Sequence, residues 1–168
     1  VWFEDEARIG QQGTLTTVWA QRGSRPVAVK QTDYDWAYLA AVVCPATGEA
    51  LGVIEREMNT GVMDDLLANL SRRLGRDRHA VLVWDNAGFH TSARLEVPSN
   101  ITILRLPPYS PELNCVERVW AWMRSHSLSN RAYADHDAIV AAIGHACDLL
   151  PPERLRSICR TAWLERGN

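Results

Sequence analysis

Long apolar runs and export signals are missing from this sequence. The longest apolar stretch without a charge, WAYLAAVVC at 36–44, is too short to cross a bilayer. No basic segment followed by an apolar run suggests a secretion leader. We therefore expect neither a membrane protein nor a secreted one, and place the protein in the cytoplasm.

Cysteine and histidine patterns typical of metal sites are also missing. The four cysteines, at 44, 115, 147 and 159, lack the close pairing of a zinc site, and the five histidines are scattered. In a cytosol such cysteines stay reduced. We expect free thiols and no histidine cluster.

An excess of basic charge, common in DNA-binding domains, is absent. Lys and Arg number 18 against 20 Asp and Glu, a net charge of −2. Phosphate contacts need cations, so charge alone does not indicate a nucleic-acid partner. What the chain does have is 168 residues, 46% of them hydrophobic, which predicts a single domain, residues 1–168, with a substantial core.

The most informative stretch is 81–120. It opens with HAVLVW, an apolar run of the length and β-branched content of a buried strand, and this run ends on Asp85. Asn86, Ala87 and Gly88 follow, so the chain turns where the carboxylate appears. Because ligands bind at the carboxyl ends of strands in open α/β sheets, Asp85 is a candidate site residue.

A helix carrying a second acid is predicted at 110–123, SPELNCVERVWAWM, after the strand ITILRL. Ser110 suits the N-cap and Pro111 the first helical position. An apolar face recurs at spacings of three and four: Leu113, Val116, Trp120 and Met123. Glu117 lies beside this face and can point toward the strand ends.

The first ten residues, VWFEDEARIG, offer a third acid. As a strand they place Asp5 on an apolar face with Phe3 and Ala7, while Glu4 and Glu6 share a polar face. Glu4 and Glu6 need no special explanation there. Asp5 is costly to bury unpaired, so it needs a cation or a shared proton, and a metal held together with Asp85 would supply the cation.

Three motifs together, FEDE, VWDNAGFH and LPPYSPELNCVERVW, resemble the catalytic domain of a DDE transposase. The similarity is to the bacterial insertion-sequence branch of the mariner-like superfamily. It implies an α/β, ribonuclease H-like fold, a five-stranded mixed sheet flanked by helices. Two acids come from adjacent central strands and one from a later helix. Matched motif by motif, the catalytic and metal-binding acids are Asp5, Asp85 and Glu117.

The resemblance also implies a reaction and partners. Two Mg²⁺ ions, with Mn²⁺ as a substitute, would support DNA strand cleavage and strand transfer on transposon ends and target DNA. The active complex would be a homo-oligomer, a dimer, in a bacterial cytoplasm. A DNA-recognition domain would precede Val1, where the chain begins without methionine and directly in a strand.

Three polar neighbours are weaker candidates. Asn86 holds the turn through side-chain hydrogen bonds. His90 either contacts a DNA phosphate or only completes the loop. Asn114 orients the start of the helix or a ligand.

Each acid also has an ordinary interpretation when it is taken alone. Asp5 suits a solvated or salt-bridged acid, and Asp85 suits a cap on its turn. Glu117 suits a surface acid paired with Arg118 or Arg124. Two rival functions remain for the whole chain: another ribonuclease H-like nuclease, such as a resolvase or exonuclease, and a non-catalytic remnant that binds DNA or protein.

The other expected elements follow from periodicity and turn residues. They are a strand TLTTVWA at 14–20 that pairs with the first strand as a hairpin, a strand at 35–43, an edge strand at 49–57, a helix at 60–74, a short helix or loop at 92–96, and helices at 136–150 and 152–160.

Overall fold

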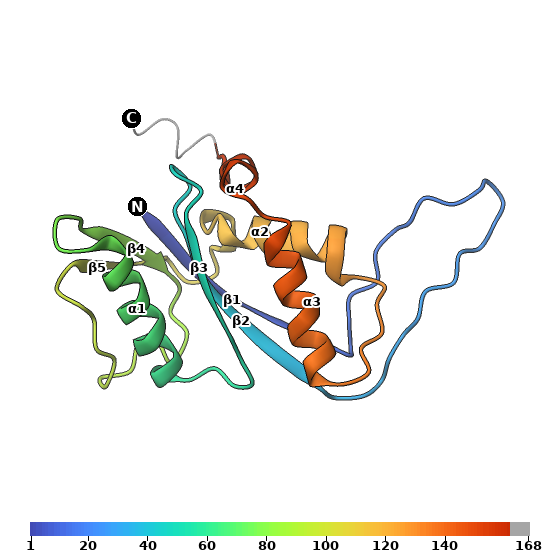
Figure 1. Ribbon diagram of the computed structural model, residues 1–168, viewed down its shortest axis with the longest axis horizontal. Helices are drawn as coiled ribbons and strands as arrows, with labels where there is room; N and C mark the ends of the chain where they lie inside the picture. Colours follow the sequence, from blue (N-terminus) through green and yellow to red (C-terminus); the bar gives the residue numbers. More distant parts are fainter. Residues whose placement is uncertain (162–168) are drawn as a thin grey trace.

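A computed structural model describes residues 1–161 as a five-stranded sheet with helices on both faces (Figure 1). The elements in chain order are β1 (Trp2–Gly10), β2 (Trp36–Val43), β3 (Ala50–Glu55), α1 (Thr60–Leu74), β4 (Ala80–Trp84), β5 (Ile101–Arg105), α2 (Val116–Met123), α3 (His136–Asp148) and α4 (Pro152–Cys159). The strand order is β3-β2-β1-β4-β5, antiparallel from β3 to β1 and parallel from β1 to β5. The predicted mixed five-stranded sheet is confirmed.

The register of β1 and β4 sets the position of two predicted acids. The two strands pair at Trp2↔Leu82 and Phe3↔Val83. Asp5 and Asp85 each follow this last pair by two residues, so both stand where the parallel strands stop pairing. Asp85 is thus at the carboxyl end of β4, as predicted, and Asp5 lies level with it inside β1, which continues to Gly10.

Two apolar cores cover the two faces of the sheet. On one face, Phe3, Ala7 and Ile9 belong to a buried cluster that includes side chains of α2, α3 and α4. On the other face, Trp2 joins a cluster built around α1. The odd and even residues of β1 therefore face different cores, as the alternation of a strand requires.

The helices predicted at 60–74, 136–150 and 152–160 are confirmed, with ends that differ by at most two residues. α1 begins where the Asn59 side chain accepts a hydrogen bond from Val62 N at 3.2 Å, and it ends at Gly75, with φ of 74°. Within the described residues, no helix is long and apolar enough to span a membrane.

The hairpin strand predicted at 14–20 is wrong. Residues 11–35 leave the body as a long connection between β1 and β2 (Figure 1, blue loop), and Trp19 and Val27 are almost fully exposed. The pattern of TLTTVWA suits a strand, but β2 already pairs with β1 from Phe3 to Gly10. β2 therefore occupies the hairpin position predicted for 14–20, while β4 pairs with β1 only at Trp2 and Phe3.

The helix predicted at 110–123 is interrupted. Pro111–Leu113 form a single 3₁₀ turn, Asn114 is extended, and α2 begins at Val116. The break follows from Asn114: its Oδ1 accepts from Val116 N at 3.1 Å, and its Nδ2 donates to the Glu4 carbonyl at 2.8 Å. An amide side chain that binds the first helical N–H is a cap, so Asn114 takes the place expected of Ser110.

Candidate metal-binding active site

One cavity of about 440 Å³ collects the three acids predicted from the motifs. Asp5 reaches it from β1, Asp85 from the turn after β4, and Glu117 from the first turn of α2. The remaining wall is Asn86, Ala87, the loop at 106–111 and Asn114. Residues far apart in the sequence thus line one opening beside the end of β4.

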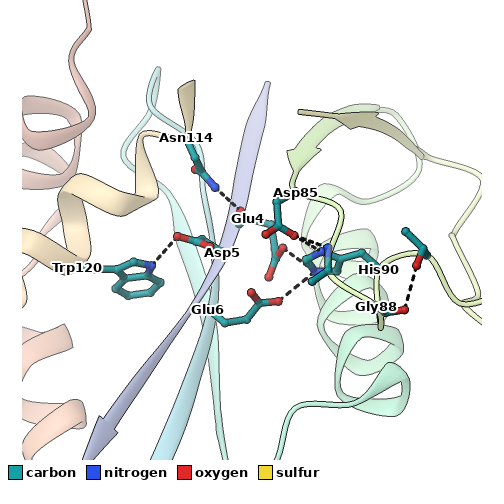
Figure 2. Close-up of polar contacts among 10 residues, drawn as sticks. Glu4, Asp5, Glu6, Asp85, Gly88, His90, Asn114 and Trp120 are labelled. Atoms are coloured by element: carbon teal, nitrogen blue, oxygen red, sulfur yellow. Dashed lines mark hydrogen bonds and ion pairs between the residues drawn. The ribbon is translucent and has the colours of Figure 1, made fainter. Parts of the chain in front are cut away.

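Asp5 is held in a largely buried position on β1. Its Oδ2 accepts a hydrogen bond from Trp120 Nε1 at 2.9 Å (Figure 2). Burial, followed by the negative charges of Glu117 and Glu6, raises the pKa of Asp5 to about 7, although the Trp120 bond lowers it. The Asp5 carboxylate therefore lacks nearby positive charge, which a bound cation would provide.

Asp85 is held through one of its two oxygens. Oδ1 accepts from Ala87 N at 2.8 Å and lies 2.9 Å from His90 Nδ1. Asn86 donates to the Leu106 carbonyl at 2.8 Å and ties the turn to the chain beyond β5. Among the described contacts none uses Asp85 Oδ2, which leaves that oxygen available to a ligand.

Glu117 stands at the start of α2 beside the cavity. Within residues 1–161 it forms no ion pair with Arg118 or Arg124; Arg118 instead donates to the Arg160 carbonyl at 2.8 Å. The surface ion pair that the sequence left open is therefore not formed. Because Asn114 binds both Glu4 O and Val116 N, the start of α2 is fixed against β1.

A second group of charged side chains lies on the opposite face of β1. His90 Nε2 is 3.0 Å from Glu4 Oε2 and 3.0 Å from Glu6 Oε1, and its Nδ1 faces Asp85 (Figure 2). Glu4 and His90 are each only 1% exposed. The His90 ring stacks on Trp84, with centroids 4.3 Å apart. The ring thus faces the carboxylates and not the solvent.

Glu4 and Glu6 share one face of β1 as predicted, but this face is covered, so the two acids do need an explanation. The turn after Asp85 folds back over β1, so that His90 covers Glu4 and largely covers Glu6. Trp2 lies on the same face of the strand and is buried. A tryptophan alternating with glutamates was the sequence signal that this face is not open to water.

The two carboxylates change the charge state of the imidazole. Burial lowers the pKa of His90, but Glu4 and Glu6 outweigh that effect and raise it to about 10. Burial raises the pKa of Glu4, with His90 acting in the opposite direction. When no cation is bound, Glu4 and Glu6 therefore favour the protonated form of the His90 imidazole.

Comparison with known proteins gives consistent matches. Residues 1–140 match the family described as DDE superfamily endonuclease. An uncharacterized protein, y4pE/y4sA of Sinorhizobium fredii (strain NBRC 101917 / NGR234), is 42% identical over 134 residues, covering 79% of this chain and 99% of that protein. The insertion element IS630 uncharacterized 39 kDa protein of Shigella sonnei is 24% identical over 156 residues, covering 90% of this chain and 46% of that protein.

Among solved structures, the Mos1 mariner paired end complex with Mn has a chain of similar fold. The TM-score is 0.69 at 16% identity, over 94% of this chain and 51% of that one. This likeness confirms the predicted ribonuclease H-like fold. The present protein spans about half the length of the Mos1 chain and about half the length of the insertion-element protein.

Proposed function

The chain belongs to the DDE superfamily endonuclease family, and from that premise we propose that it is the catalytic domain of an insertion-sequence transposase. It cleaves DNA strands and transfers them, with divalent metal ions bound at Asp5, Asp85 and Glu117. The observation that carries the proposal is the cavity that receives these three acids from two adjacent strands and a helix. The likeness to an insertion-element protein favours this reading over a resolvase, an exonuclease or a non-catalytic remnant.

The residues present fit a site for hard divalent cations. The proposed ligand atoms are carboxylate oxygens, which Mg²⁺ and Mn²⁺ prefer. Asp85 keeps one oxygen clear of the described hydrogen bonds, and burial followed by the negative charges of Glu117 and Glu6 raises the pKa of Asp5. Asp5, Asp85 and Glu117 would together hold the two divalent ions that catalyse phosphoryl displacement in such sites.

Bound metal ions would stabilise the charge that develops on the attacking and leaving oxygens of an in-line phosphoryl displacement. The chain's own residues fix the geometry. Trp120 holds Asp5, Ala87 N and His90 hold Asp85, and Asn114 fixes the start of the Glu117 helix against β1. The attacking group is water in strand cleavage and a DNA 3′-hydroxyl in strand transfer.

Divalent-dependent nicking of supercoiled plasmid by this chain tests the proposal. Glu117→Gln should reduce nicking at least about a hundredfold, equivalent to losing roughly 3 kcal/mol of transition-state stabilisation. Glu112→Gln is the matched control, because Glu112 is an exposed acid in the 3₁₀ turn and does not line the cavity. Equal losses in both variants, or nicking that persists in Glu117→Gln, would reject the assignment of the third acid.

DNA is the proposed partner, recognised here by its backbone. The net charge of −2 predicts weak duplex binding with modest salt dependence, because few phosphates are neutralised. Contacts to phosphate position DNA without reading its sequence, so end recognition belongs to a domain outside residues 1–168. A dimer in the active complex is part of the same proposal. A gel-shift competition between terminal-repeat and scrambled DNA should show no preference; a clear preference at moderate salt would contradict this division of roles.

A further inference from the structure

The buried group formed by Glu4, Glu6 and His90 is not used by the proposed reaction. Their ligand atoms, two carboxylate oxygens and one ring nitrogen, all lie within 4.8 Å of one another. No other set of three acids, histidines or cysteines in the described part of the chain meets that spacing. The group lies on the face of β1 opposite Asp5 (Figure 2).

Hydrogen bonding leaves this group incomplete. Nε2 of His90 carries at most one proton, yet it stands 3.0 Å from an oxygen of Glu4 and 3.0 Å from an oxygen of Glu6. No hydrogen bond of normal geometry reaches Nε2, Glu6 Oε1 or either oxygen of Glu4 within residues 1–161. Glu4 is 1% exposed, neither of its carboxylate oxygens has a hydrogen bond among the described residues, and one of them lies 3.0 Å from His90 Nε2, so the group can accept a further ligand.

The spacing suits a metal ion. Two ligand atoms bound about 2.1 Å from one octahedral ion, at right angles, lie about 3.0 Å apart. The other ring nitrogen, Nδ1, is 2.9 Å from Asp85 Oδ1. A carboxylate that accepts the Nδ1 proton fixes the tautomer in which Nε2 is free to bind metal, an arrangement common around metal-bound histidines. Stacking on Trp84 holds the ring plane.

From this geometry we propose that Glu4, Glu6 and His90 form a separate site for one divalent transition-metal ion, such as Mn²⁺ or Zn²⁺. An imidazole ligand favours these ions over Mg²⁺, which prefers oxygen. Three protein ligands leave positions for water. A cavity of about 560 Å³ is lined by Glu6 together with Arg8, Trp36, Tyr38, Arg56 and Phe89, so it reaches the Glu6 side of this group.

Ion binding at the proposed site can be tested without the DNA chemistry. The protein carrying both Asp5→Asn and Glu117→Gln keeps this group intact and removes two acids of the cavity. Mn²⁺ titration followed by electron paramagnetic resonance, in excess Mg²⁺, should give one site per chain. Electron spin-echo modulation should detect a coordinated ¹⁴N, which distinguishes this site from one built of carboxylates.

Glu6→Gln in that background is the decisive variant, because the Glu6 side chain is partly exposed and its loss should leave the fold intact. It should weaken Mn²⁺ binding at least about tenfold, the lower end of the cost of losing even an outer-shell partner. His90→Gln should remove the nitrogen signal. His79→Gln, at an exposed histidine bonded to Thr102, should change neither result. Absence of Mn²⁺ binding, binding without nitrogen coupling, or binding unaffected by Glu6→Gln would overturn the proposal.

Discussion

Neighbouring carboxylates on the two faces of β1 lie in different surroundings. Asp5 lines an open cavity with Glu117 and accepts a side-chain hydrogen bond from Trp120. Glu4 and Glu6 point to the opposite face, where His90 closes over them. The same strand therefore carries one acid short of positive charge and two acids supplied with an imidazole.

A single loop residue, His90, determines the surroundings of the acids on one face of β1. His90 comes from the turn after β4, and the same ring that contacts Glu4 and Glu6 also contacts Asp85. Asp85 is therefore connected to both faces: one oxygen belongs to the His90 side, and the carboxylate lines the cavity. Changes on the buried face should reach the cavity through this contact.

The largest expected effect is on stability. His90→Ala leaves Glu4 buried without a cation and should lower the free energy of unfolding by about 3–5 kcal/mol in chelator. His79→Ala, at an exposed position, should cost less than about 1 kcal/mol. Adding Glu4→Gln to His90→Ala should restore part of the loss. Urea unfolding of the unsubstituted protein and of these three variants measures the free energies of unfolding. A loss below about 1 kcal/mol for His90→Ala would mean that the stability of the buried face does not depend on the imidazole.

On the cavity face, removing the charge of Asp5 should raise the free energy of unfolding. The folded-state pKa of Asp5, about 7, is above its ordinary value of 3.8. The stability contributed by Asp5 is therefore fully present below pH 4 and is lost as pH rises through 7. In metal-free protein at pH 8, Asp5→Asn should raise the free energy of unfolding, by on the order of 2 kcal/mol after solvent screening. The gain should shrink toward pH 4; a loss of stability at pH 8 would contradict the burial argument.

A smaller effect, on Mg²⁺ affinity, is expected from the hydrogen bond between Trp120 and Asp5. Trp120→Phe removes the bond that lowers the pKa of Asp5, so a larger fraction of Asp5 is protonated at pH 7. Protons then compete with metal, and Mg²⁺ affinity should fall by up to about tenfold. Trp122→Phe, whose ring stacks on His126 away from the acids, is the control. Calorimetric titration at pH 7 compares them, and equal affinities would show that Trp120 does not tune Asp5.

Much of the fold could be predicted because the strands and helices carry strong local patterns. α1 has a capping Asn59, a regular apolar face and a terminal Gly75, and its predicted bounds are those observed. The segment at 14–20 has an equally good strand pattern, but β2 takes its predicted place beside β1, from Phe3 to Gly10. Strand pairing depends on the whole sheet, which periodicity within one segment does not report.

The candidate site was also predicted only in part. The motifs and the strand alternation predicted that Asp5, Asp85 and Glu117 lie together. In the structure all three line one cavity. The contact of His90 with Glu4 could not be predicted, because it depends on how the turn at 86–90 folds back over β1. The helix break at Asn114 likewise arises from a bond to a strand more than a hundred residues earlier.

The most direct test of the central claim, that the cavity acids bind the divalent ions of a DNA-cleaving enzyme, is Mg²⁺ titration by calorimetry on variants of the two faces of β1. Saturable binding should disappear in Asp5→Asn and remain within about twofold in Glu6→Gln, because Mg²⁺ prefers the carboxylate cavity to the site that contains imidazole. Unchanged binding in Asp5→Asn, or loss confined to Glu6→Gln, would contradict the assignment of the cavity as the catalytic metal site.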